Sequence, residues 1–221
     1  MNTIESIKTR HATRGYLDKP VERQLIEKIL EAARFAPSGV NTQPWQVAVV
    51  QGKTKQQLTE QMISAKESKQ APNPDYAYYP DQWEEPYKTR RKTCGLALYT
   101  ALDIQRGDIA KQIQAWNNNY RFFDAPVGLL FFIDQQLNQG SWLDMGMFIQ
   151  NIMLAATHYE LSTCPQASLA DYPDIVRNLL HIDSQYAVVC GMALGYEDKT
   201  HPANRFRLER EPVDSFTSWY D

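Results

Sequence analysis

The fold of this chain is organised around Ala36-Pro37-Ser38-Gly39-Val40-Asn41-Thr42-Gln43-Pro44-Trp45, a polar loop that runs directly into the apolar residues 47–50. Pro44 disfavours a helical backbone at Gln43, and Gly39 permits backbone angles that other residues avoid. Hydrogen-bonding side chains are concentrated in the same loop, at Ser38, Asn41, Thr42 and Gln43. The pattern predicts a rigid loop that is anchored by a strand and binds a polar ligand.

A second candidate binding stretch lies upstream and is cationic. It reads Lys8-Thr9-Arg10-His11-Ala12-Thr13-Arg14-Gly15-Tyr16 and follows the end of a short helix expected over residues 3–10, with Thr3 as its cap. Lys8, Arg10 and Arg14 are three cations within seven positions. A phosphate-bearing cofactor could be bound by such a cluster.

Size and composition are those of one folded domain, which we expect to cover residues 1–221. Of the 221 residues, 43% are hydrophobic and 11% are aromatic, which is enough for a packed core. The formal net charge of -3 argues against a nucleic-acid-binding protein. The longest apolar run, residues 125–133, is too short to span a membrane, and residues 1–5 lack the features of a signal peptide. We therefore expect a cytoplasmic protein with no nucleic-acid or membrane partner.

Metal and disulfide sites are not indicated by the cysteines or histidines. The three cysteines, Cys94, Cys164 and Cys190, are odd in number and widely spaced, and the four histidines are equally scattered, so we expect no bound metal. Nucleophilic hydrolysis is poorly supported, because Ser38 has no identifiable histidine partner and Cys164 has no nearby base. The sequence also lacks the phosphate-binding glycine loops and the common hydrolase motifs.

Hydrophobic periodicity predicts helices separated by three short strands. The expected helices cover residues 3–10, 21–35, 54–65, 88–102, 108–116, 142–158 and 173–180. The expected strands cover residues 45–51, 127–133 and 187–194. Helices between the strands favour a sheet that is covered on both faces. Because residues 142–158 are apolar almost all round, we expect that helix to be buried either centrally or in a subunit interface.

Three segments lack such periodicity. Residues 66–87 form an irregular, lid-like insertion, in which Tyr76, Tyr78, Tyr79 and Trp83 could stack on a planar substrate or simply pack the loop onto the body. Residues 162–168 are interpreted as a small polar loop. Residues 197–221 form a C-terminal arm, whose apolar residues Phe216 and Trp219 suggest that it lies on a partner subunit.

Several motifs, taken together and in order, resemble the FMN-dependent nitroreductase family. The first two are the cationic stretch and the polar loop quoted above. The others are Phe123-Asp124-Ala125-Pro126-Val127, Trp142-Leu143-Asp144-Met145-Gly146, Thr163-Cys164-Pro165-Gln166-Ala167 and Cys190-Gly191-Met192-Ala193-Leu194-Gly195-Tyr196. The resemblance spans nearly the whole chain and is weakest over residues 66–87.

The resemblance implies an α+β fold of the nitroreductase type, a three-layer α-β-α sandwich with helices around a mixed sheet. It also implies an intertwined homodimer that exchanges its C-terminal arms and has two FMN sites at the interface. The implied activity is transfer of a hydride from NADH or NADPH through N5 of FMN to a nitroaromatic or quinone acceptor by a ping-pong mechanism. The implied partners are a second copy of the chain and a small planar electron acceptor.

The same resemblance implies cofactor contacts position by position. One subunit would contribute Arg10, His11, Ala12 and Arg14 to the phosphate, ribityl chain and ring edge, and the other would contribute Pro37, Ser38, Gly39 and Asn41, with Gln43 nearby. The pyrimidine side of the flavin would face Asn118 and Arg121, its N5 would face Pro165, Gln166, Ala167 and Ser168, and its phosphate would be bound by Arg207 and Arg210. The sequence departs from the family pattern at Ala12, where a serine is common, and at Ala167 and Ser168, where an acidic residue and a glycine can stand.

Electrostatic stabilisation is the main role left for side chains in this interpretation. Reduction of FMN leaves negative charge near N1 of the ring, and Arg14 or Arg121 would stabilise it. Each arginine could instead be an ordinary surface ion-pair partner. Enone reduction, dehalogenation and flavin-dependent oxidation of a heterocycle are alternatives within the same fold. A flavin-binding protein without turnover is an alternative from another class.

Overall fold

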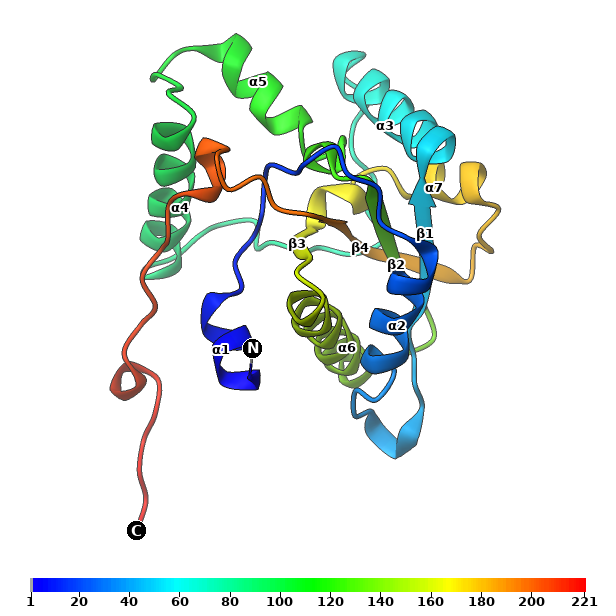
Figure 1. The fold of residues 1–221 in the computed structure, drawn as a ribbon, viewed down its shortest axis with the longest axis vertical. Coiled ribbons are helices and arrows are strands. Elements are labelled where there is room, and N and C mark those ends of the chain that lie inside the picture. Colours follow the sequence, from blue (N-terminus) through cyan, green and yellow to red (C-terminus); the bar gives the residue numbers. More distant parts are fainter. Residues whose placement is uncertain (1) are drawn as a thin grey trace.

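A four-stranded antiparallel sheet lies at the centre of the fold (Figure 1). The computed structural model describes residues 2–221. The strands are β1 (Gln46–Gln51), β2 (Val127–Asp134), β3 (Ser162–Gln166) and β4 (Tyr186–Gly195), in the spatial order β1-β2-β4-β3. All three pairings are antiparallel, and among the described residues a parallel contact is limited to the isolated bridge between Ala12 and Thr163. The sheet is therefore antiparallel and not mixed, which corrects the sequence-based expectation.

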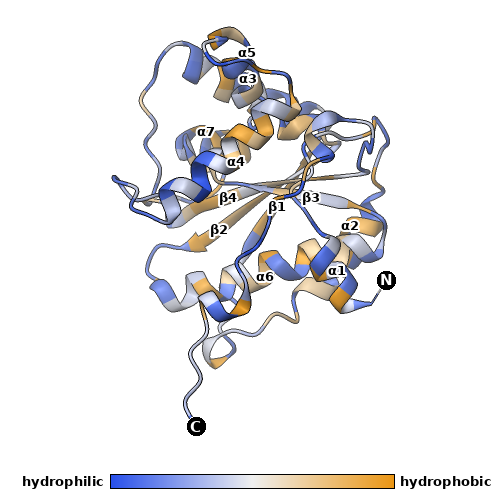
Figure 2. Cartoon of the chain, turned by 90° about the vertical axis from the view of Figure 1, so that its left-hand side faces the viewer, coloured by the Kyte–Doolittle hydropathy of each residue, from blue (hydrophilic) through white to orange (hydrophobic). Residues whose placement is uncertain are grey.

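Helices cover both faces of this sheet, as the sequence predicted. They are α1 (Thr3–Thr9), α2 (Arg23–Ala33), α3 (Gly52–Glu67), α4 (Tyr87–Ala101), α5 (Ile109–Asn117), α6 (Gln139–His158) and α7 (Pro173–Leu180). One hydrophobic core lies between the sheet and helices α2 and α6, and a second lies between the sheet and helices α3 and α7. Figure 2 shows the two helical layers on opposite sides of the sheet. The expected three-layer α+β architecture is thus confirmed.

Apolar patterning explains why the central strands and the covering helices form where they do. In β2 only the last residue is not buried, and in β4 only the first. In α2 the buried residues Ile26, Ile29 and Ala33 recur at the spacing of one helix face. Strands that are apolar on both faces require a helical layer on each side, so the sequence pattern and the layering have the same cause.

Two local expectations are wrong. Residues 162–166, interpreted as a loop, form the edge strand β3. This strand has no apolar run and contains Pro165, and proline is tolerated at the edges of sheets.

Helix α1 is capped by Asn2 and not by Thr3. The Asn2 side chain accepts a hydrogen bond from the Glu5 backbone N–H at 2.9 Å, and Glu5 accepts one from the Asn2 N–H at 3.1 Å.

The structure also describes the two segments predicted as an irregular insertion, residues 66–87, and as a C-terminal arm, residues 197–221. Residues 68–86, all within the described part of the chain, form no helix or strand. After β4 the chain passes the start of α4 and the end of α1, then extends away from the body to the C-terminus (Figure 1). The side chains of Phe216, Trp219 and Tyr220 in this arm are exposed by 71%, 79% and 92%.

Helix α6 is buried on one face and exposed on another. Met145, Phe148 and Ile152 lie in the core, whereas Leu143 and Met147, one helical turn apart, expose an apolar stripe. Across residues 2–221 no helix combines the length and the apolar character needed to span a bilayer.

Candidate functional site

A cationic cavity of about 650 Å³ lies where the segment after α1 meets the C-terminal arm. Its lining includes six of the residues that the sequence nominated, which are Arg10, His11, Ala12, Arg14, Arg207 and Arg210. Lys8 from α1 and Gln150 from α6 also line it. Residues about 200 positions apart in the sequence are thereby gathered around one hollow.

The surroundings of the Arg10 side chain indicate which kind of ligand the cavity can bind. It ends α1, and its guanidinium reaches Met153 of α6, with 3.9 Å between Nη1 and Sδ. Its Nε is buried and has no hydrogen-bond partner. Burial lowers the pKa of Arg10, and the neighbouring positive charge of Arg210 lowers it further. A half-buried cation with an unused donor and a second cation beside it is arranged to bind an anion.

The other arginines of the cavity are held by neutral groups. The Arg14 backbone N–H donates to the Asn204 side-chain oxygen at 2.7 Å, Arg207 donates to the Asn204 carbonyl at 2.7 Å, and Arg210 donates to the Leu208 carbonyl at 3.0 Å. The ion pairs formed among residues 2–221 involve none of these arginines and not Arg10. The cavity therefore carries a positive charge that no carboxylate of the protomer neutralises.

His11 links the cationic stretch, residues 8–16, to the C-terminal arm, residues 197–221. Its Nε2 lies 2.9 Å from a carboxylate oxygen of Glu197, and its Nδ1 lies 3.2 Å from the Thr9 carbonyl oxygen. Buried Asn204 makes a second connection by donating to the Gly15 carbonyl at 2.8 Å. These bonds explain how the non-periodic arm is placed so that Arg207 and Arg210 face Arg10.

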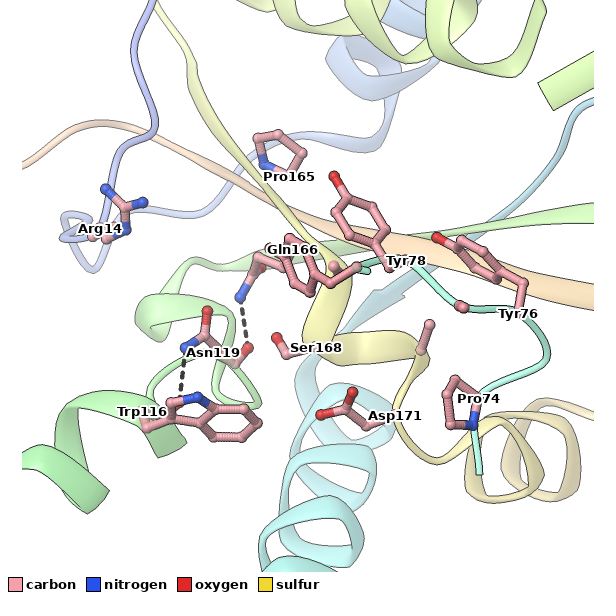
Figure 3. Close-up of a pocket in the computed structure, with 14 residues that line it drawn as sticks. Arg14, Pro74, Tyr76, Tyr78, Trp116, Asn119, Pro165, Gln166, Ser168 and Asp171 are labelled. Carbon is pink, nitrogen blue, oxygen red and sulfur yellow. Dashed lines mark hydrogen bonds between the residues drawn. The ribbon is translucent and has the colours of Figure 1, made fainter. Parts of the chain in front are cut away.

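A second cavity, of about 550 Å³, adjoins the first through Arg14, which lines both. Pro165, Gln166, Ala167 and Ser168, at the end of β3 and just beyond it, form one wall. Tyr76, Tyr78 and Tyr79 of the irregular insertion also line it, and Figure 3 shows Tyr78 near Gln166; we call this aromatic-lined hollow the planar cavity. Two buried polar atoms on the β3 side, Gln166 Oε1 and Ser168 Oγ, lack a hydrogen-bond partner. Both are free to bond a polar ring that enters the cavity.

Asn118 and Arg121 are not brought to either cavity. They line a separate hollow that they share with Asp124 and Glu67, whereas Asn119 lines the planar cavity. The Asn119 carbonyl accepts a hydrogen bond of 2.6 Å from Gln166. Directly after Arg121, residues 122–124 all adopt left-handed backbone angles, with φ of 56°, 52° and 61°.

The polar loop of residues 36–45 is rigid but lies away from the cationic cavity of its own protomer. Positive φ angles occur at Val40, Asn41 and Gln43, and the Gln43 N–H donates to Ser38 Oγ at 3.0 Å. The Gly39 N–H donates to Asp144 of α6 at 3.1 Å. Arg10 contacts the same helix at Met153, nine residues further on, which is roughly 13 Å along the axis. Pro37, Ser38, Gly39, Asn41 and Gln43 therefore face outward, separate from the arginines.

Sequence reasoning missed several residues that line or support the two cavities. Asn204 belongs to a non-periodic arm, where no pattern signals that its side chain is buried. Trp116 and Asn119 line the planar cavity from the turn that ends α5. The only sequence signal there was the run of three asparagines, which does not indicate which amide points inward.

The buried cysteines are expected to be unreactive. Burial raises the pKa of the Cys164 thiol to about 11, although the positive charges of Arg14 and Arg10 act in the opposite direction, and burial raises the pKa of Cys190 to about 12. Both thiols stay protonated below those values, so only half-buried Cys94 should react at about pH 8. A thiol titration should find no more than one fast-reacting group in the native chain and three after denaturation. A second fast-reacting thiol in the native protein would contradict this assignment.

Comparisons with known proteins agree with this geometry. A family model described as "Nitroreductase family" matches residues 7–196. The chain is 39% identical to a 4-nitrobenzoate reductase of Pseudomonas putida over 211 residues, which cover 96% of this chain and 92% of that protein. It is similar in structure to the FMN and NADPH-dependent nitroreductase NfnB from Sphigopyxis sp. strain HMH, with a TM-score of 0.96, 34% identity and full coverage of both chains. The FMN-dependent nitroreductase NfnB from Mycobacterium smegmatis, solved with NADPH, gives a TM-score of 0.94 at 30% identity, over 99% of this chain and 97% of that one.

Proposed function

The chain belongs to the nitroreductase family, and from this premise we propose that it is an FMN-dependent oxidoreductase that passes a hydride from NADH or NADPH to nitroaromatic or quinone-type acceptors. The observation that carries the proposal is the cluster of arginines without carboxylate partners, joined through Arg14 to the planar cavity. The curated and structural relatives named above act on nitroarenes or use FMN and NADPH.

The residues present fit FMN. Its phosphate dianion would be held by Arg10, Arg207 and Arg210, whose charges have no other partner in the protomer. Its ring would lie along residues 165–168, where the unpartnered Gln166 and Ser168 oxygens could bond the ring's polar edge. When bound, FMN supplies the centre that accepts and donates hydride.

Arg14 is the residue proposed to tune that chemistry. It lines both cavities, so its guanidinium places a fixed positive charge between the phosphate end and the ring end of the site. A positive charge fixed in advance favours the anionic form of a bound ring. Arg121 lines the separate hollow and not the planar cavity, so we assign this role to Arg14.

We infer a ping-pong mechanism, in which nicotinamide and acceptor use the same opening in turn. The support for it is that Arg14, residues 165–168 and the tyrosines line a single cavity of about 550 Å³. Two planar substrates would therefore use the same place in turn. Neither the cysteines nor Ser38 is required as a nucleophile in such a reaction.

We also propose that the working unit is a homodimer of the single domain 1–221, with the arm 197–221 exchanged and the loop 36–45 supplied to the partner's cavity. The exposed stripe of Leu143 and Met147 supports this, because it leads along α6 to Gln150, which lines the cationic cavity. A partner that covers the stripe would also close the cavity.

The first test is spectroscopic. We expect the purified protein to be yellow and to bleach under anaerobic conditions when NADH or NADPH is added. Stopped-flow reduction with each nucleotide would identify the preferred donor. Colourless protein that takes up no added FMN would refute the proposal.

The acceptor is decided by a second measurement on the reduced protein. Nitroarenes and quinones should reoxidise it in steady state, and a panel that adds enones, halogenated phenols and oxygen separates the other activities of this fold. Yellow protein that bleaches but is reoxidised by none of these acceptors would favour a flavin-binding protein without turnover.

A further inference from the structure

The irregular insertion is attached to the body of the protein mainly around residues 73–76, and the Tyr172 hydroxyl also donates to the Gln70 carbonyl at 3.2 Å. The Asp75 carboxylate lies 2.5 Å from the guanidinium of Arg177 in α7, and the two side chains are only 14% and 12% exposed. Next to them Asn73 donates to Asp174 at 2.8 Å, and its backbone N–H donates to the Asp171 carbonyl at 3.0 Å. A buried ion pair therefore holds a segment that has no helix or strand of its own.

The insertion also forms hydrogen bonds with the part of β4 that β3 leaves unpaired. Strand β3 pairs with β4 only from Gly191 to Gly195, so the β4 residues before Gly191 have no strand on that side. Asp75 accepts a hydrogen bond from the Val188 N–H at 2.8 Å, and the Tyr76 hydroxyl donates to the Val189 carbonyl at 2.5 Å. Val189 lies at the bulge where the pairing of β2 with β4 changes register. Two side chains of the insertion thus satisfy backbone groups that a longer β3 would have bonded.

Tyrosines of the insertion line the planar cavity, and Tyr76 also packs the segment onto the body. The centroid of the Tyr76 ring lies 4.4 Å from that of Trp142. Tyr78 and Tyr79 follow two and three residues later and line the planar cavity. Their ring centroids lie 4.6 Å apart, with the rings packed edge to face. Their side chains are 58% and 59% exposed, so their faces are open to an incoming molecule. Figure 3 shows Tyr78 across the cavity from Arg14, near Gln166.

We propose that Asp75 and Arg177 are positioning residues for the electron acceptor, because their ion pair fixes the place of Tyr78 and Tyr79 in the planar cavity. The inference rests on the proposed function and deepens it by assigning affinity for planar acceptors to an ion pair outside the cavity. Neither Asp75 nor Arg177 lines either cavity. The pair would therefore act on the acceptor and not on the retention of FMN.

The test compares Asp75→Asn with Asp75→Ala. Asparagine keeps an oxygen for the Val188 N–H and loses the ion pair, whereas alanine loses both. We expect the KM for nitrobenzene to rise roughly tenfold or more in Asp75→Ala, because a small displacement of positioning groups is enough to cause such a loss, and to rise less in Asp75→Asn. Flavin content and the rate at which oxygen reoxidises the reduced protein should not change, because oxygen needs no aromatic wall. Arg177→Lys, which keeps the charge, should restore part of the affinity that Arg177→Gln loses.

A matched control is Glu27→Gln. It removes an exposed ion pair on α2, in which Glu27 Oε1 lies 2.7 Å from Arg23 Nε, and it should leave the KM, the flavin content and the rate of reoxidation unchanged. Asp75→Asn covers the case in which Asp75→Ala does not fold, because it keeps an acceptor for the Val188 N–H and should still raise the same KM. An unchanged KM in these variants would overturn the proposal, as would a parallel loss of flavin and of oxygen reactivity.

Hydrogen exchange tests the anchoring of the insertion independently of the proposed function. Residues 68–86 should exchange faster in Asp75→Ala than in the unsubstituted chain, whether or not flavin is bound. A colourless protein in which that difference is seen would refute the proposed function and leave the anchoring established. Equal exchange in both proteins would refute the anchoring itself.

Discussion

Arg10→Ala is expected to weaken the binding of FMN by roughly a hundredfold while the chain keeps its fold. Removing a cation that pairs with a desolvated anion costs about 3 kcal/mol, which corresponds to that factor. Arg10 has an unpartnered Nε and no carboxylate within the protomer, so the flavin-free protein gains little from the guanidinium. The substitution should therefore separate ligand binding from folding.

The measurement is the dissociation constant of FMN, from quenching of flavin fluorescence, together with the thermal midpoint of the flavin-free protein. Arg10→Met is the closer variant, because it keeps the stem that packs near Met153 and removes only the charged group. Arg23→Ala, which breaks an exposed ion pair elsewhere, is the control and should leave both values unchanged. Loss of stability in proportion to loss of FMN would contradict a phosphate-binding role.

The second large effect is expected from Leu143→Asp. Leu143 is 72% exposed in the protomer, so the substitution should not disturb the core. If a partner covers the stripe of Leu143 and Met147, the new carboxylate would be buried without a partner, which costs several kcal/mol. We expect a monomer that holds little flavin, because the polar loop of the second chain is then missing from the site.

Light scattering after size exclusion, combined with the flavin absorbance of each peak, checks this result. Met147→Asp should behave in the same way, because it lies one turn along the same stripe. Val49→Asp, on an exposed position of the edge strand β1, is the control for an added charge. A monomer that keeps its full complement of FMN would show that the site is complete within one chain.

The sequence by itself determined the elements and the family. Its periodicity predicted the seven helices and three of the four strands, because burial on one face leaves a repeat in the sequence. The edge strand β3 was not found, since five residues with a proline carry no such repeat. The ordered motifs led to the nitroreductase family, and the rigidity of residues 36–45 could be foreseen from Gly39 and Pro44.

Only the tertiary structure decided which of the nominated residues meet. The arm places Arg207 and Arg210 against Arg10 through His11 and Asn204, and these contacts join residues about 190 positions apart. Asn118 and Arg121 line a separate hollow, whereas Asn119 lines the planar cavity. No pattern in the sequence indicated the ion pair of Asp75 and Arg177 either, through which we propose that Tyr78 and Tyr79 are anchored. The physical reason is that periodicity records whether a side chain is buried, whereas the direction of a side chain in a turn and its distant partner depend on packing that no local pattern contains.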